Sequence, residues 1–176
     1  MIISSKISIS NSIFINNQAV KGASLGIICT FLSQCDVSLK NITFNNNTAS
    51  SMGGGIYYNL NRPSLTDCGF MNNSALHGPD IASYAVKIVK SGTQENKITL
   101  NDVASSLLYQ NTLSFDLIDF DRQIMNLENS HTVKIFPKLP TSSVKGTDFS
   151  KFQEGIVKFD NLIFINKAGA QEVAFE

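Results

Sequence analysis

The chain has 176 residues, 14 basic and 14 acidic side chains, no formal net charge and only 16% charged residues, where about 25% is usual for a soluble domain. This balance argues against nucleic-acid binding, because neutralising phosphates requires an excess of basic side chains. Residues 1–85 hold seven charged side chains and 11 of the 18 asparagines, and residues 86–176 hold the other 21 charged side chains. We therefore expect two differently built domains, residues 1–85 and 86–176.

Residues 1–85 contain an internal repeat with the pattern aliphatic, x, Asn/Asp, x, x, Phe, x, Asn, Asn, x, Ala. Its three copies are Ile9–Ala19, Leu39–Ala49 and Leu65–Ala75. A glycine follows each copy at nearly the same offset, and the copies begin 30 and then 26 residues apart. A repeat of this length indicates an architecture of stacked units.

The apolar residues within each copy alternate with polar ones, which is typical of short β-strands. Three strands per copy, separated by asparagine pairs and by Gly53–Gly55, predict one triangular coil. Stacked at roughly 4.8 Å, such coils form a short right-handed parallel β-helix of about three coils. The fold class is therefore predicted to be all-β.

In-register stacking places equivalent residues of the three copies one above another. We expect an interior column of phenylalanines and three ladders of paired amides at the corners, where asparagine tolerates a left-handed backbone. The predicted members are Phe14, Phe44 and Phe70; Asn11, Asn41 and Asp67; Asn16, Asn46 and Asn72; and Asn17, Asn47 and Asn73.

The repeat resembles those of the chlamydial polymorphic outer-membrane protein family and of large surface proteins of ciliates and other protists. The family signature, Phe-x-x-Asn followed by Gly-Gly-aliphatic, is matched by Phe44–Asn47 with Gly54–Ile56. The first copy keeps Phe14–Asn17 but lacks the double glycine. The resemblance implies a pectin-lyase-like β-helix on an extracellular or cell-surface protein, with roles in adhesion, structure or filament formation.

The second half changes character at about residue 85, where charge rises and strand-like runs alternate with turn signals. The predicted strands are Tyr84–Val89, Lys97–Leu100, Leu113–Phe120, Thr132–Phe136, Gly155–Phe159, Leu162–Ile165 and Gln171–Phe175. About seven short strands in some 90 residues is the number found in an immunoglobulin-like β-sandwich. The closing segment, Gly155–Phe175, resembles the last hairpin of such modules.

The cysteines and the sequons bear on the cellular compartment. Cys29, Cys35 and Cys68 show no Cys-x-x-Cys spacing, so no zinc site is predicted. Their odd number leaves two alternatives, buried free thiols or one disulfide with one thiol left over. Asn-x-Ser/Thr sequons at Asn41, Asn46 and Asn72 would accept glycans if the chain is secreted, which would make it a glycoprotein.

Few residues carry the pattern of a reactive site. Asp116, Asp119 and Asp121 are candidates for a calcium site, but no Gly or Asn completes a binding loop, and a strand with its acids facing outward fits the pattern better. His77 has no catalytic partner nearby in sequence and is expected to pack at a corner. We expect no enzymatic activity, no cofactor and no membrane span.

The sequence thus predicts a noncatalytic extracellular structural or adhesive segment that acts through coil stacking and protein–protein assembly. Other protein chains, or preceding sequence, would cap the first coil, because solenoids need covered ends. The alternative is a carbohydrate-binding or polysaccharide-processing β-helix module. Coplanar aromatic side chains, or two carboxylates meeting in a groove, would favour that alternative.

Overall fold

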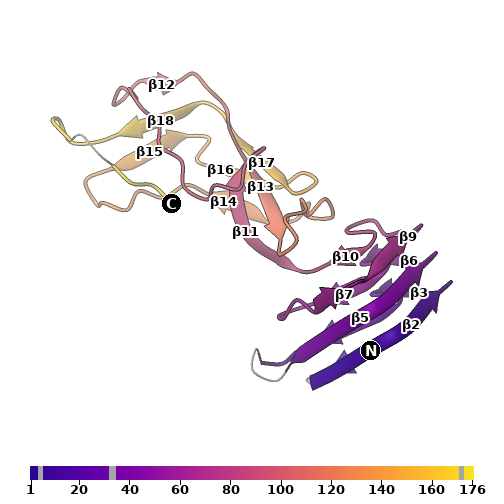
Figure 1. Cartoon of the computed structure of the whole chain (residues 1–176). Coiled ribbons are helices and arrows are strands. Elements are labelled where there is room, and N and C mark those ends of the chain that lie inside the picture. The colour runs from indigo at the N-terminus through magenta and orange to yellow at the C-terminus, as the bar shows by residue number, and fades with distance from the viewer. Residues whose placement is uncertain (4–5, 32–34, 171–172) are drawn as a thin grey trace. The chain divides into compact units, whose positions relative to one another are not determined.

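Figure 1 shows a computed structural model of the chain, in which residues 1–3, 6–31, 35–170 and 173–176 are described. These residues form β-strands and no helix, which confirms the all-β class. A membrane-spanning helix is accordingly not found in the described ranges. The chain divides into two units, Met1–Val86 with Asp119–Gln123, and Lys87–Ile118 with Ile124–Glu176.

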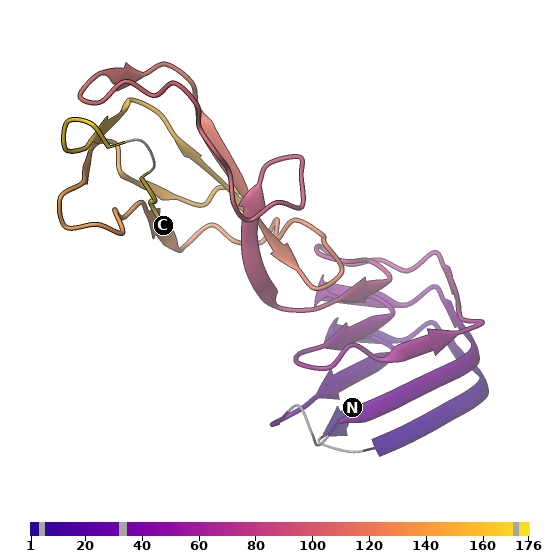
Figure 2. The same ribbon diagram turned by 60° about the vertical axis from the view of Figure 1, so that its left-hand side comes forward.

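The N-terminal unit contains three parallel sheets, each with strands from successive copies of the repeat (Figures 1 and 2). One sheet holds β1 (Ile2–Ile3), β4 (Leu25–Ile28), β7 (Ile56–Tyr58) and β10 (Ile81–Ala82); another holds β2 (Lys6–Ile15), β5 (Asp36–Asn45), β8 (Ser64–Thr66) and β9 (Gly69–Met71); the last holds β3 (Gln18–Lys21) and β6 (Thr48–Met52). We call β2–β4 layer 1, β5–β7 layer 2 and β8–β10 layer 3.

Equivalent residues of the copies are paired across the layers. Ile9 pairs with Leu39, which pairs with Leu65. Phe44 lies between Phe14 and Phe70, with ring centroids 5.4 and 4.8 Å apart and planes within 11° of parallel. In-register parallel pairing follows from the repeat, because side chains of the same type then share each interior column.

The asparagines at the corners have the left-handed backbone that this residue tolerates better than most. The φ angles lie between 51° and 57° at Asn11, Asn16, Asn41, Asn46, Asp67 and Asn72. Each layer therefore bends twice at an Asn or Asp, once between its strand segments and once before the next sheet. The polar positions of the repeat are set by these bends as well as by hydrogen bonding.

Of the two alternatives for the three cysteines, the structure has one disulfide with one thiol left over. Cys29 and Cys35 form a disulfide, which joins the end of layer 1 to the start of layer 2. Both are buried in the core of the N-terminal unit. Cys68 is a free thiol.

The C-terminal unit is built from three small sheets. They are β11 (Ala85–Lys90), β13 (Leu113–Asp119) and β17 (Ile156–Phe159); β12 (Leu108–Tyr109), β18 (Leu162–Ile165) and β15 (Ser143–Gly146); and β14 (Thr132–Lys134) with β16 (Phe149–Lys151). Four strand pairs of this unit are antiparallel: β12 with β18, β13 with β17, β14 with β16, and β15 with β18. Phe152, Val157, Phe159 and Leu162 form its buried core.

Some predicted strands of this half are wrong. Lys97–Leu100 is not a strand, and β17 and β18, which follow each other in the chain, belong to different sheets. Residues 171–172 of the predicted last strand lie outside the described residues, and Phe175 makes a single bridge with Pro137. Apolar runs as short as these do not specify which strand each of them will pair with.

Candidate functional site

The first feature with functional potential is a row of stacked amides that crosses all three layers. Asn47 is fully buried, and its Oδ1 accepts hydrogen bonds from the backbone N–H and from Nδ2 of Asn17, at 3.0 and 2.8 Å. Asn47 repeats both bonds toward Oδ1 of Asn73, at 3.1 and 3.0 Å. The buried amide of Asn47 is therefore satisfied by the equivalent residues of layers 1 and 3, which ties the three layers together at one register.

Two further rows lie on the outside of the N-terminal unit. Asn41 Nδ2 donates to Asn11 Oδ1 at 2.8 Å, and Asn46 Nδ2 donates to Asn16 Oδ1 at 2.5 Å. The sequon asparagines Asn41, Asn46 and Asn72 are all exposed. An attached glycan would retain one amide hydrogen on each, so glycosylation at these positions stays a prediction.

The layer 3 end of the unit is joined to a five-residue segment from far along the sequence, Asp119–Gln123. The Asp119 carboxylate is buried, and its Oδ2 lies 3.1 Å from His77 Nε2 and 3.3 Å from the backbone N of Ser83. Because an ionised carboxylate only accepts hydrogen bonds, the Nε2 atom carries the hydrogen. Gln123 donates to the carbonyl of Ile81 at 2.8 Å, which attaches the segment to β10.

The pKa of Asp119 is lowered from its ordinary value. Burial opposes ionisation of this carboxyl, but hydrogen bonds from His77 and from the backbone N–H groups of Gln123 and Ser83 outweigh the burial. The charged form of Asp119 is therefore favoured in the folded protein. The pair fixes the segment to layer 3 and has no access to solvent, since both side chains are at most 2% exposed.

The next acid of the segment has partners of its own. Asp121 accepts hydrogen bonds from Tyr58 Oη at 2.6 Å and from Arg62 Nε at 2.8 Å. Burial, followed by the hydrogen bond to Asp121, raises the pKa of Tyr58. Tyr58 therefore stays protonated and acts as a donor.

The three acids considered for calcium do not meet. Asp116 is bound by Ser91 Oγ at 2.5 Å and Gly92 N at 3.2 Å, whereas Asp119 and Asp121 bind separate groups on layers 2 and 3. Among the described residues, no group of three His, Cys, Asp or Glu side chains is placed to hold a metal ion. The expectation that these acids face outward is wrong for Asp116 and Asp119, which are buried because hydrogen-bond donors offset the loss of hydration.

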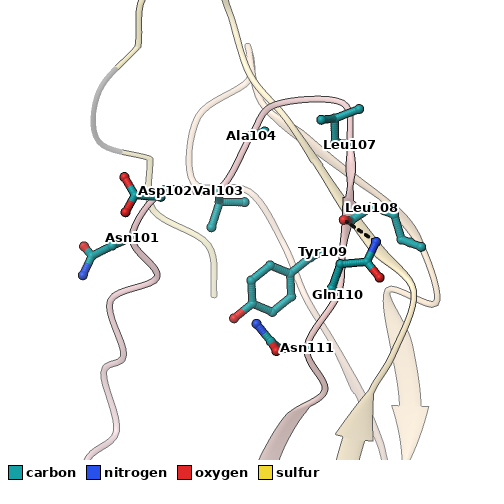
Figure 3. Close-up of a pocket in the computed structure, with 9 residues that line it drawn as sticks. All are labelled: Asn101, Asp102, Val103, Ala104, Leu107, Leu108, Tyr109, Gln110 and Asn111. Carbon is teal, nitrogen blue, oxygen red and sulfur yellow. Dashed lines mark hydrogen bonds between the residues drawn. The ribbon is translucent and has the colours of Figure 1, made fainter.

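The C-terminal unit contains a hollow of about 280 Å³ (Figure 3). It is lined by Asn101, Asp102, Val103, Ala104, Leu107, Leu108, Tyr109, Gln110 and Asn111. The lining has one aromatic ring and one carboxylate, and the carboxamide of Gln110 is already bonded to the carbonyl of Leu108 at 3.4 Å. The hollow therefore brings together neither two aromatic rings nor two carboxylates.

Sequence reasoning did not find the partnership of His77 with Asp119. The two residues are 42 positions apart, and neither belongs to a recognisable motif. The available signal was the group of charged residues Asp119, Asp121 and Arg122 around a single phenylalanine.

One comparison with known proteins bears on these features. Residues 41–59 match the family model of the Chlamydia polymorphic membrane protein repeat. The match runs from the first corner of the second copy, Asn41, to Asn59, the residue after β7. Searches of the curated proteins and of the solved structures found no significant match.

Proposed function

We propose that this chain is a noncatalytic structural or adhesive segment of an extracellular or cell-surface protein, and that its N-terminal unit is a short right-handed parallel β-helix. The observation that carries the proposal is the register of the three copies, with Asn47 hydrogen-bonded to its equivalents on both sides. The in-register stacking of like residues characterises solenoids, which present extended surfaces for binding other proteins. For the C-terminal unit, the immunoglobulin-like sandwich is the corresponding proposal.

The surface location is supported by two independent features. The matched repeat is named for a membrane protein of Chlamydia, and disulfides such as Cys29–Cys35 persist mainly in oxidising compartments. The exposed sequons at Asn41, Asn46 and Asn72 are compatible with that compartment. We infer that the chain works outside the reducing cytosol.

Two assays together test the proposal. The purified chain is incubated with a panel of polysaccharides, and new reducing ends and unsaturated sugars are measured against a heat-denatured sample. Beads coated with the chain are then tested for adhesion to cells and to beads that carry other proteins with this repeat. We expect adhesion and no sugar release; turnover of any polysaccharide, or an absence of adhesion to every surface, would contradict the proposed function.

A further inference from the structure

The hollow of the C-terminal unit, lined by residues 101–104 and 107–111 and here called the Tyr109 hollow, lies at the end of a long connection (Figure 3). Residues 91–107 join β11 to β12 and contain no strand. Connections in compact domains have a median length of about 4–6 residues, and ordered ones beyond about 12–15 residues are usually functional. This connection is therefore the first place in the C-terminal unit to search for a ligand.

Both walls of the Tyr109 hollow are attached to β18. The turn between the walls is bonded to the end of that strand, because Ser106 N donates to the carbonyl of Phe164 at 2.9 Å. Ser105 Oγ accepts from Asn166 N at 3.1 Å and donates to the carbonyl of the same residue at 3.4 Å. The other wall contains β12, which pairs with β18. The hollow is thus formed before a ligand arrives, so binding requires little ordering of the chain.

One aromatic ring faces the hollow. Tyr109 projects from β12 toward the wall that holds Asn101 and Asp102 (Figure 3). Its ring packs edge-to-face against Phe164, with centroids 6.0 Å apart, which holds it in one orientation. The side chain is only half-buried, so part of the ring is free to contact a ligand. Such a ring offers an apolar surface with a negative face, which attracts the polarised C–H groups of a sugar.

The polar side chains around this ring are not engaged by the protein. Within the described part of the chain, Asn101, Asp102 and Asn111 line the hollow and their side chains make no hydrogen bond. Gln110 differs, because its carboxamide donates to the carbonyl of Leu108. Two carboxamides, which both donate and accept, and one carboxylate, which accepts, are therefore free to bind a ligand.

This combination fits one neutral sugar ring. A sugar ring carries hydroxyl groups on its rim and C–H groups on its faces, so it uses polar and aromatic contacts at once. Among the described residues, those that line the hollow include a carboxylate and no basic side chain, so Asp102 would repel an anionic sugar. The volume of about 280 Å³ lies just below the roughly 300–1,000 Å³ of sites for drug-sized ligands, which indicates a single ring.

The same lining indicates binding without cleavage. Glycoside hydrolysis generally uses a pair of carboxylates on either side of the scissile bond, and the Tyr109 hollow has only that of Asp102. A site of this kind would hold the end of a glycan and leave it intact.

We propose that the Tyr109 hollow binds the terminal unit of a neutral glycan. The ring of Tyr109 lies against one face of the sugar, and the side chains of Asn101, Asp102 and Asn111 bond to its hydroxyl groups. This inference rests on the proposed function, and it names a ligand for the adhesive segment.

The experiment follows the amide signals of the complete, nitrogen-15-labelled chain by NMR while one probe at a time is added. The probes are the methyl glycosides of glucose, galactose, mannose and N-acetylglucosamine, with glucuronate and choline as charged counterparts. We expect saturable shifts centred on residues 101–111 with at least one of the glycosides, at a Kd of about 10 mM or below. Glucuronate should bind more weakly than that glycoside.

Variants of exposed side chains test the contacts without disturbing the fold. Asn101→Ala combined with Asn111→Ala should weaken binding at least about tenfold. Asn96→Ala is the matched control, because its side chain is exposed in the same connection but does not line the hollow; binding should be unchanged. Asp102 has a φ of 56°, which asparagine tolerates, and Asp102→Asn should raise the affinity for glucuronate relative to the neutral glycoside.

Three results would overturn the inference: no saturable shift at residues 101–111 with any of the four glycosides, an unchanged affinity in the double variant, or an equal loss in Asn96→Ala. Tighter binding of choline than of every glycoside would also overturn it, because the ring and carboxylate would then recognise a cation. Adhesion to protein-coated beads by a chain that binds no sugar would leave the proposed function standing. Loss of all adhesion in a chain that still binds sugar would contradict the proposed function alone.

Discussion

At the residue scale, neighbouring asparagines of the repeat have different roles. Asn46 takes a left-handed backbone at an exposed corner, with φ of 55°. Asn47 is fully buried and bonded to Asn17, Asn73 and Phe14. The carboxamide of Asn46 also donates to Asn16, but at an exposed position, whereas the hydrogen bonds of the Asn47 carboxamide are buried.

Replacing Asn47 with alanine should therefore lower the free energy of unfolding by about 3 kcal/mol, because it leaves the N–H of Asn17 and the carbonyl of Phe14 without partners. Urea denaturation of the complete chain measures the change. Asn45→Ala is the matched control: the buried Oδ1 of Asn45 has no hydrogen-bond partner, so its removal should cost less than about 1 kcal/mol. Equal losses for both variants would contradict the role given to the ladder.

Two glycines of the repeat, Gly54 and Gly55, are explained by close contact between layers 2 and 3. A Cβ atom on Gly54 would lie 2.4 Å from the carbonyl oxygen of Pro79 and 2.5 Å from that of Ser74. Gly54→Ala should therefore destabilise the fold by more than about 2 kcal/mol. The control is Gly69→Ala, where a Cβ meets no atom within 4 Å; thermal unfolding should show little change for it, and a comparable loss there would show that layer contact is not the cause.

At the element scale, the disulfide between Cys29 and Cys35 restricts the connection from β4 to β5. Its loop has a sequence separation of 6, so the chain-entropy treatment gives a stabilisation of about 2 kcal/mol. The double variant with both cysteines replaced by serine should lose about that amount in urea unfolding. Labelling of the unfolded, unreduced chain should modify Cys68 alone; labelling of three thiols would contradict the bridge.

The segment Asp119–Gln123 should make the stability of the N-terminal unit depend on pH in the acidic range. Burial opposes ionisation of Asp119, yet hydrogen bonds from His77, Gln123 and Ser83 lower its pKa overall. A carboxyl with a lowered folded pKa stabilises the fold above its unfolded value of about 4, and this contribution is lost as the pH falls toward the folded pKa.

Asp119→Asn is accordingly expected to flatten the fall in stability below about pH 4, measured by urea unfolding at a series of pH values from neutral to acidic. Glu128 of the C-terminal unit also has a pKa lowered to about 2, by backbone N–H groups of His131 and Ser130. The comparison is therefore made with Glu128→Gln present in both proteins. An unchanged pH profile after Asp119→Asn would contradict the role given to the buried pair.

Predictability from sequence also differs between the elements. The strands of the first half were predictable because like residues recur at the positions that pair, such as Phe14, Phe44 and Phe70. The second half has no repeat, so nothing local specified that β18 would pair with β12 and β15. The burial of Asp116 and Asp119 depends on donors 25 and 42 residues away, and such contacts leave no periodic signal.

At the scale of the whole molecule, the stacking of the repeat explains why charged residues are distributed unevenly along the chain. Stacked layers place equivalent side chains at about 4.8 Å, where like charges repel. Residues 1–85 hold seven of the 28 charged side chains, and paired amides occupy the columns instead. The low charge of the N-terminal unit is therefore a consequence of the repeat.

The central claim is that the three copies lie parallel and in register, and disulfide trapping tests it most directly. Ser8 lies opposite Ser38 on adjacent layers, so Ser8→Cys with Ser38→Cys, in a Cys68→Ser background, should oxidise readily to an additional bridge without loss of stability. Ser8→Cys with Lys40→Cys is shifted by two residues and should form little bridge under the same conditions. Preferential formation of the shifted bridge, or of neither, would contradict the account.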